Sequence, residues 1–128
     1  MPPYQVVIVD DDDLALSALK RLVAFWGFDV VPFGRFEDAR AFINARKPDA
    51  LIVDVRLGEY NGLQLVHIAK QAAPEMAVIA MSGFDDSVLR AEAERAGATY
   101  LVKPLDLSRL RQFLPGAIDS HEPRPPAD

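Results

Sequence analysis

Residues 7–13, VIVDDDD, join an apolar segment directly to four consecutive aspartates. The side chains of Val7, Ile8 and Val9 are β-branched, and this residue type favours β-strands. Adjacent carboxylates repel one another, so the acidic run needs either a solvated helix start or a cation that neutralises it. The free backbone N–H groups at a helix start stabilise carboxylates. The rest of the chain has to decide between these two explanations.

The composition is that of a small globular domain. The chain has 128 residues, of which 50% are hydrophobic and 26% are charged, so it can build one core. It has no cysteine and only two histidines, which excludes disulfides and argues against a zinc site. The net charge of −5 argues against direct nucleic-acid binding. No signal peptide and no apolar run of membrane-spanning length is visible, so we expect a cytoplasmic protein without a membrane partner.

Short β-branched segments alternate with longer segments of helical periodicity along the chain. The predicted strands cover residues 5–9, 29–32, 50–55, 77–81 and 99–102. The predicted helices cover residues 12–26, 36–46, 62–72, 85–96 and 107–114. Strands that are apolar on both faces and alternate with helices predict an α/β fold with a parallel sheet. We expect one domain over residues 1–114 and a disordered, Pro-rich tail or linker stub over residues 115–128.

Polar side chains stand at the ends of four predicted strands. They are Asp10 and Asp11, Asp54, Ser82, and Lys103. The carboxyl ends of parallel strands meet at one edge of the sheet, so these side chains should share a crevice. A carboxylate cluster without histidine or cysteine suits a hard ion such as Mg²⁺. A lysine and a hydroxyl beside it suit a phosphoryl group, with Asp54 as the candidate nucleophile.

At this point the chain resembles a receiver domain of two-component response regulators, of the stand-alone, single-domain type. The matching motifs are IVDDDD at residues 8–13, LIVDV at 51–55, Gly62, AMSG at 80–83 and YLVKP at 100–104. The resemblance extends from residue 5 to residue 113. It implies a flavodoxin-like (βα)5 three-layer sandwich with the strand order 2-1-3-4-5.

The resemblance also implies roles for the acidic residues. Asp54 matches the phosphoacceptor, which takes a phosphoryl group from a histidine kinase or a histidine phosphotransfer protein. Asp10 and Asp11 match the acidic pair that holds Mg²⁺, with Mn²⁺ as an alternative ion. Asp11 would bind the metal directly and Asp10 through water. Asp54 and the main-chain carbonyl of Arg56 would complete the protein ligands.

Further roles follow from the resemblance at the later strands. Ser82 and Lys103 match the residues that bind the phosphoryl group. Ser82 and Tyr100 match the switch pair, in which the ring of Tyr100 moves inward when Ser82 turns toward the phosphoryl group. Pro104 matches a proline that the family often has in the cis form.

The output surface implied by the resemblance is the face made by the fourth helix, the fifth strand and the fifth helix. This face would carry Arg90, Glu94, Arg109 and Arg111. It would change its preference for an unidentified downstream protein, and a phosphorylation-dependent homodimer is left open.

Two features depart from the usual family pattern. Gly58 stands where many members have proline, four residues after Asp54, so we expect a more mobile loop. Arg56 and Phe84 stand two residues after Asp54 and Ser82, where they border the path of attacking water. We hypothesise that these two large side chains block that water and lengthen the lifetime of the phosphoryl group.

Simpler explanations compete for several residues. Asp12 and Asp13 suit helix capping better than metal binding. Tyr100 could serve packing alone, and Phe25 and Trp26 are predicted to pack at the end of the first helix.

Two other functions compete with the phosphorylated switch. One is a protein-binding pseudo-receiver that acts without phosphorylation. The other is a phosphatase with an aspartyl nucleophile, but its acid/base carboxylate would have to stand at Arg56. A dinucleotide or flavin binder lacks its Gly-rich loop after the first strand. We expect a signalling switch that catalyses only its own phosphorylation and dephosphorylation, and no enzyme that acts on an external substrate.

Overall fold

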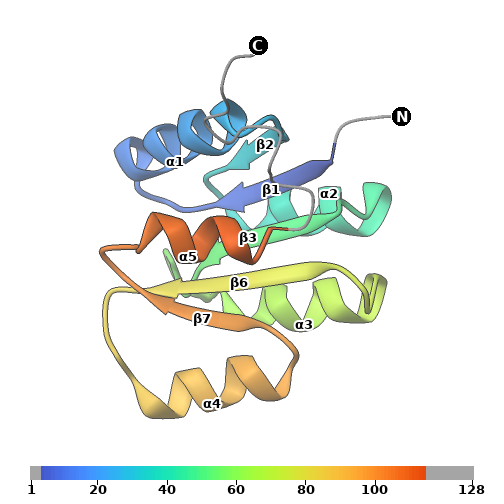
Figure 1. The fold of residues 1–128 in the computed structure, drawn as a ribbon. Helices are drawn as coiled ribbons and strands as arrows, with labels where there is room; N and C mark the ends of the chain where they lie inside the picture. The colour runs from blue at the N-terminus through green and yellow to red at the C-terminus, as the bar shows by residue number, and fades with distance from the viewer. Residues whose placement is uncertain (1–3, 115–128) are drawn as a thin grey trace.

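The computed structural model describes residues 4–114 and contains a five-stranded parallel sheet in the order β2-β1-β3-β6-β7 (Figure 1). Its strands are β1 (Gln5–Val9), β2 (Asp29–Phe33), β3 (Ala50–Asp54), β6 (Ala77–Ser82) and β7 (Thr99–Val102). The short strands β4 (Arg56–Leu57) and β5 (Tyr60–Asn61) form a separate antiparallel hairpin. Without the hairpin, the order in the sheet is 2-1-3-4-5, so the predicted fold class and strand order are confirmed.

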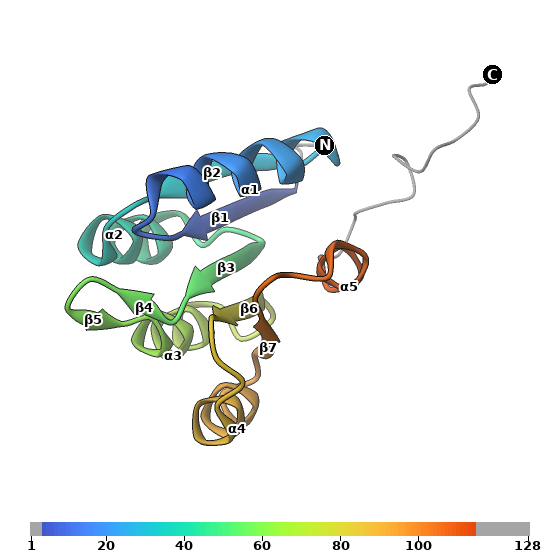
Figure 2. The ribbon, with the colours of Figure 1, turned by 90° about the vertical axis from the view of Figure 1, so that its left-hand side faces the viewer.

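Five helices cover the sheet on both faces. They are α1 (Asp13–Phe25), α2 (Phe36–Arg46), α3 (Leu63–Ala72), α4 (Ser87–Arg95) and α5 (Leu107–Gln112). Figure 2 shows α1 and α5 on one side of the sheet and α2, α3 and α4 on the other. This arrangement is the predicted three-layer sandwich.

The alternation of side chains along β1 shows how the two halves of the core form. Val6 and Ile8 belong to the cluster that includes Val23 of α1 and Leu110 of α5. The intervening Val7 joins the cluster of α2, α3 and α4, as does Val9. Successive residues of a strand point to opposite faces, so a continuous apolar strand supplies both cores.

Three helices begin one residue after an aspartate that caps them. Asp12, Asp86 and Asp106 each accept hydrogen bonds from two backbone N–H groups of the following turn. These caps explain why α1 and α4 begin later than predicted, because a capping residue lies outside the helix. The capping role predicted for Asp12 is therefore confirmed. At the other end of the chain, α5 ends at Gln112, two residues earlier than predicted.

The two aromatic residues at the end of α1, Phe25 and Trp26, differ in their exposure to solvent. Trp26 is 8% exposed and packs in the core as predicted. Phe25 is 77% exposed, so the packing prediction for it was wrong. Helical spacing turns only one of two adjacent residues toward the sheet.

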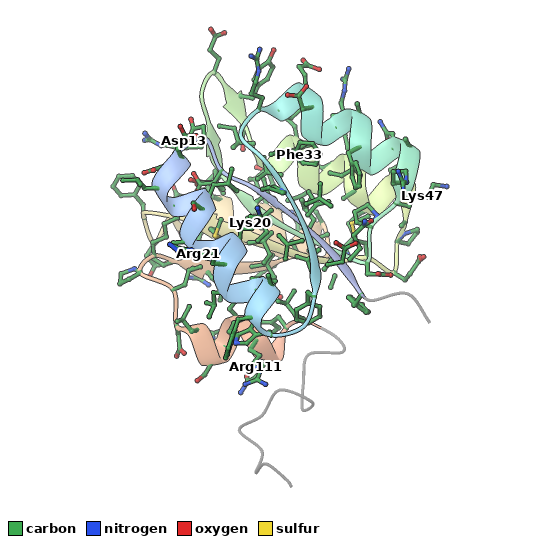
Figure 3. All side chains as sticks on the ribbon, turned by 90° about the horizontal axis from the view of Figure 1, so that it is seen from above. Asp13, Lys20, Arg21, Phe33, Lys47 and Arg111 are labelled. Carbon is green, nitrogen blue, oxygen red and sulfur yellow. The ribbon has the colours of Figure 1, made fainter. Side chains whose placement is uncertain are left out.

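The face of α1 and α5 carries basic side chains (Figure 3). Lys20 and Arg21 lie along α1 and are exposed, and the guanidinium of Arg111 on α5 lies 5.7 Å from the ring of Trp26.

Among the described residues, no helix has the length and apolar character needed to cross a membrane. The predicted tail over residues 115–128 lies outside the described residues.

Candidate functional site

The carboxyl edge of the sheet brings three aspartates together. Asp54 is the last residue of β3, and Asp10 and Asp11 directly follow the neighbouring strand β1. Each offers a carboxylate oxygen, and these oxygens lie within 4.8 Å of one another. Asp10 is 2% exposed and Asp54 is 8% exposed, whereas Asp11 is exposed. The structure therefore assembles the three predicted carboxylates into one cluster.

Main-chain N–H groups hold each of these carboxylates in place. The Oδ1 atom of Asp10 accepts a hydrogen bond of 3.0 Å from the N–H of Asp12. The Oδ1 atom of Asp54 accepts one of 3.2 Å from the N–H of Arg56. The Oδ2 atom of Asp11 accepts one of 2.7 Å from the N–H of Gly58 in the hairpin turn. The acidic cluster is thus tied both to the start of α1 and to the β4–β5 hairpin.

Lys103 reaches the same cluster from the end of β7. Its Nζ atom lies 3.0 Å from Oδ2 of Asp54 and 3.5 Å from Oδ2 of Asp10. Its backbone N–H donates to the carbonyl of Ser82 at 2.8 Å, which joins β7 to β6 at this edge. The peptide bond between Lys103 and Pro104 is cis, as predicted. The lysine is placed where a phosphoryl group on Asp54 would meet its charge.

The electrostatics of the cluster follow from burial and charge. Burial raises the pKa of the Asp10 carboxyl, and the nearby charge of Asp54 raises it further. The hydrogen bond from Asp12 and the charge of Lys103 oppose this rise without cancelling it. Burial works against a charged Lys103, but its hydrogen bonds and attraction to Asp54 and Asp10 outweigh burial and raise its pKa. Lys103 therefore stays positive at neutral pH.

The donor set fits a hard divalent cation. Three carboxylates face a single ammonium group, which leaves the cluster with excess negative charge. Carboxylate oxygens are the ligands that such ions prefer, and a cation would offset the repulsion among the three carboxylates. The predicted additional ligand, the carbonyl of Arg56, belongs to β4 directly after this cluster. Its role as a ligand stays a prediction.

The two predicted switch residues both bind the main chain of Phe84. The Oγ atom of Ser82 accepts a hydrogen bond of 3.1 Å from the N–H of Phe84. The hydroxyl of Tyr100 donates to the carbonyl of Phe84 at 2.9 Å. Ser82 is 5% exposed and Tyr100 is 2% exposed. The loop after β6 therefore links the two side chains directly.

The position of Tyr100 differs from the expected starting point of the switch. We predicted that the ring moves inward on phosphorylation, but here it is already buried. Arg90 of α4 covers the ring, with its guanidinium 4.9 Å from the ring centroid. Arg90 also forms an ion pair of 2.8 Å with Asp85. The hydrogen bond to Phe84 and the cover by Arg90 account for the inward position.

Arg56 of β4 and Phe84 of the loop after β6 are in contact. The guanidinium of Arg56 lies 5.6 Å from the centroid of the Phe84 ring. Arg56 follows β3 and Phe84 follows β6, so the contact bridges the two strand ends that flank the site. Phe84 is 64% exposed. The two side chains predicted to restrain water are therefore in contact.

The β4–β5 hairpin is an element that we did not predict from the sequence. Residues 56–61 pair as a hairpin with Gly58 at φ 58° in its turn, and the greater mobility expected for this loop stays a prediction. A glycine as the first residue of a two-residue turn is the signal that could have predicted it. The ring of Tyr60 stacks on Phe36 with centroids 4.6 Å apart and planes at 11°. The hairpin is thereby packed against α2.

The comparisons with known proteins agree with this geometry. The family model for the response regulator receiver domain matches residues 6–114. The transcriptional regulatory protein ZraR of Salmonella typhimurium is 32% identical over 114 residues, which cover 88% of this chain and 26% of ZraR. The photosynthetic apparatus regulatory protein RegA of Cereibacter sphaeroides is 29% identical over 121 residues, which cover 94% of this chain and 66% of RegA.

The solved structures give the same result. A response regulator receiver domain protein (CheY-like) from Methanospirillum hungatei JF-1 superposes with a TM-score of 0.81 at 25% identity. The match covers 88% of this chain and 94% of that protein. The stand-alone type predicted from the sequence stays a prediction, since this chain spans about a quarter of ZraR. On the match over residues 6–114, the chain belongs to the family of response regulator receiver domains.

Proposed function

We propose that this chain is a phosphoacceptor switch of two-component signal transduction, with Asp54 as the phosphorylated residue. The donor would be the phosphohistidine of a histidine kinase or of a histidine phosphotransfer protein. The proposal rests on one observation above all, the ammonium of Lys103 held 3.0 Å from Asp54 and 3.5 Å from Asp10. A carboxylate nucleophile with a lysine beside it, at the open edge of the sheet, suits phosphoryl transfer.

The transfer step uses Asp54 and Lys103 as they stand, and Ser82 after it turns away from the N–H of Phe84. A carboxylate oxygen of Asp54 attacks phosphorus, and the new O–P bond forms as the P–N bond to the donor imidazole breaks. The electron pair of that bond stays with the imidazole, which leaves as a neutral ring because its other nitrogen carries a proton. Lys103 stabilises the charge on the phosphoryl oxygens, and the hydroxyl of Ser82 donates to one of them.

A divalent cation would be held by the acidic cluster. Asp10, Asp11, Asp54 and the carbonyl of Arg56 are the proposed ligands of Mg²⁺, with Mn²⁺ as an alternative ion. When bound, the cation neutralises the charge that builds up between the phosphoryl group and the carboxylates. The geometry supports this role, because three carboxylates share a single ammonium group, that of Lys103.

A groove beside the acidic cluster is the proposed docking site of the donor protein. A groove of about 480 Å³ begins at Asp10 and Lys103 and runs between α1 and the start of α5. Apolar residues line its remainder, among them Leu19 and Leu105. We propose that the partner that carries the phosphohistidine docks along this groove.

The output would be a change in partner binding on the face of α4, β7 and α5. Ser82 and Tyr100 both bind Phe84, so a turn of Ser82 toward the phosphoryl group would release one of the two bonds that hold this loop. Phosphorylation can shift the equilibrium between two conformations of this face only if the phosphoryl group interacts more favourably with one conformation than with the other. The proposed readers are a downstream protein or a second copy of this chain.

We further propose that the chain acts on itself alone and works in the cytoplasm. Arg56 stands two residues after Asp54 and cannot serve as the acid/base of a phosphatase. ZraR is named a transcriptional regulatory protein, and the 114 aligned residues cover only 26% of its length. For residues 4–114 we propose protein partners and no direct contact with nucleic acid.

Incubation with acetyl phosphate tests the proposal. Intact-protein mass spectrometry should show a gain of one phosphoryl group in the wild type with Mg²⁺ and none after addition of EDTA. Asp54→Ala should abolish the gain, whereas Asp29→Ala, which removes an exposed aspartate on β2, should keep it. A folded wild type that gains no mass from acetyl phosphate or from a phosphohistidine donor would contradict the proposal and favour a pseudo-receiver.

A further inference from the structure

The β4–β5 hairpin is fixed to α2 by the stack of Tyr60 on Phe36. The ring centroids are 4.6 Å apart and the planes differ by 11°. Phe36 is the first residue of α2, is 6% exposed and belongs to the hydrophobic core. Tyr60 lies in β5 and is 44% exposed. One ring is therefore set by the core, and it holds a surface ring that belongs to the hairpin.

The same hairpin touches the acidic cluster at two points. The N–H of Gly58 donates to Asp11 at 2.7 Å, and the N–H of Arg56 donates to Asp54 at 3.2 Å. Leu57 pairs with Tyr60 directly across the hairpin, next to the turn that contains Gly58. A shift of Tyr60 would therefore move the turn, and with it the donor that orients Asp11.

The turn has little packing of its own. Gly58 has a φ of 58°, and nothing lies within 4 Å of the place where a side chain would begin. The side chain of Leu57 is 3% exposed and anchors β4 in the core. The strand β5, which closes the turn from the other side, consists of the exposed residues Tyr60 and Asn61. Two contacts hold this side of the turn: the aromatic stack of Tyr60 on Phe36, and the hydrogen bond of 2.8 Å that Oδ1 of Asn61 accepts from the N–H of Leu63.

We infer that Tyr60 is a positioning residue for the divalent-cation site, acting through Gly58 on the carboxylate of Asp11. Asp11 is the exposed member of the cluster, so its side chain has rotamer freedom that the Gly58 hydrogen bond restricts. Groups that orient a metal ligand in this way change metal affinity by about 10- to 100-fold when they are removed. The inference rests on the proposed function, because it assumes that the cluster binds a cation.

The test compares Mg²⁺ affinity in matched variants by isothermal titration calorimetry. Tyr60→Ala removes the stack and should raise the dissociation constant by about tenfold, at the lower end of the range for such orienting groups. Tyr60→Phe keeps the ring and should bind like the wild type. Phe25→Ala removes an aromatic side chain that is 77% exposed on α1 and should also bind like the wild type.

Hydrogen exchange gives a readout that does not depend on the metal. Without Mg²⁺, the amide of Gly58 should exchange faster in Tyr60→Ala than in the wild type and Tyr60→Phe. At saturating Mg²⁺, Tyr60→Ala should reach the wild-type extent of phosphorylation, because Asp54 and Lys103 are unchanged.

The outcomes separate this inference from the proposed function. If the wild type binds Mg²⁺ and Tyr60→Ala binds it equally tightly, the inference is overturned and the proposed function stands. If Tyr60→Phe weakens binding as much as Tyr60→Ala, the hydroxyl rather than the stack matters, and the inference is again overturned. A wild type that binds no Mg²⁺ would remove the basis of both.

Discussion

The contact between Arg56 and Phe84 should set part of the lifetime of the phosphoryl group. The guanidinium of Arg56 and the ring of Phe84 lie 5.6 Å apart and join the hairpin after β3 to the loop after β6. We expect water that attacks the phosphoryl group to pass between these two side chains. A closed contact would exclude that water, and the rate of hydrolysis would then follow the fraction of time in which the contact is open.

The magnitude follows from the strength of the contact. Phe84 is 64% exposed, and a cation–π contact at an exposed site contributes about 0.5–1 kcal/mol. Since about 1.4 kcal/mol corresponds to a factor of ten, loss of the contact should speed hydrolysis by roughly two- to fivefold. Arg56→Ala and Phe84→Ala should each show at least this increase, because each removes one partner.

The assay is the decay of the phosphorylated protein after removal of the donor, followed by intact mass. The double variant should hydrolyse its phosphoryl group more slowly than the product of the two single-variant rate increases predicts. The coupling free energy between the two substitutions should be about 0.5–1 kcal/mol. Arg46→Ala breaks a similar contact with Phe42 at 5.7 Å on α2 and should leave the rate unchanged. If the rate increases of the two single variants multiply in the double variant, Arg56 and Phe84 do not act through their contact. If neither single variant changes the rate, the two side chains do not shield the phosphoryl group from water.

Three further predictions concern the acidic edge. Burial raises the pKa of Asp10, so the stability that this group lends in its protonated form is lost as the pH rises through its native pKa. Asp10→Asn should therefore stabilise the metal-free protein at pH 7 by on the order of 1 kcal/mol, and urea titrations should show this gain vanish below about pH 4. Gly62→Ala would push a methyl group into the backbone of Asp54, and urea unfolding should show a loss of about 2 kcal/mol or more. Asp12→Ala removes the cap of α1 and should cost about 1 kcal/mol in the same assay, while Mg²⁺ titrations should show unchanged affinity, in contrast to Asp11→Ala.

The sequence predicted the sheet and the meeting of its polar ends well. The runs around Val9 and Val53 are short, β-branched and apolar on both faces, and this pattern has few structural solutions other than a central parallel strand. Once the strands are parallel, their carboxyl ends share an edge, and Asp10, Asp54 and Lys103 have to meet there. This part of the site is a consequence of topology.

The parts that were missed depend on contacts between distant side chains. The hairpin strands are two residues long, too short for a period to be recognised, and the stack of Tyr60 on Phe36 is invisible in a linear pattern. The inward position of Tyr100 depends on the carbonyl of Phe84 and on the cover by Arg90. Phe25 and Trp26 look alike in sequence, but only one of them faces the sheet.

The most direct test of the central claim is to locate the phosphoryl group itself. Borohydride reduces an acyl phosphate on aspartate to the alcohol, which tandem mass spectrometry places on a residue. After phosphorylation with Mg²⁺, the account predicts homoserine at position 54 and at no other aspartate, and wild-type sequence throughout when Mg²⁺ is omitted. Reduction at Asp10 or Asp11, or a phosphorylated protein without any reduced aspartate, would contradict it.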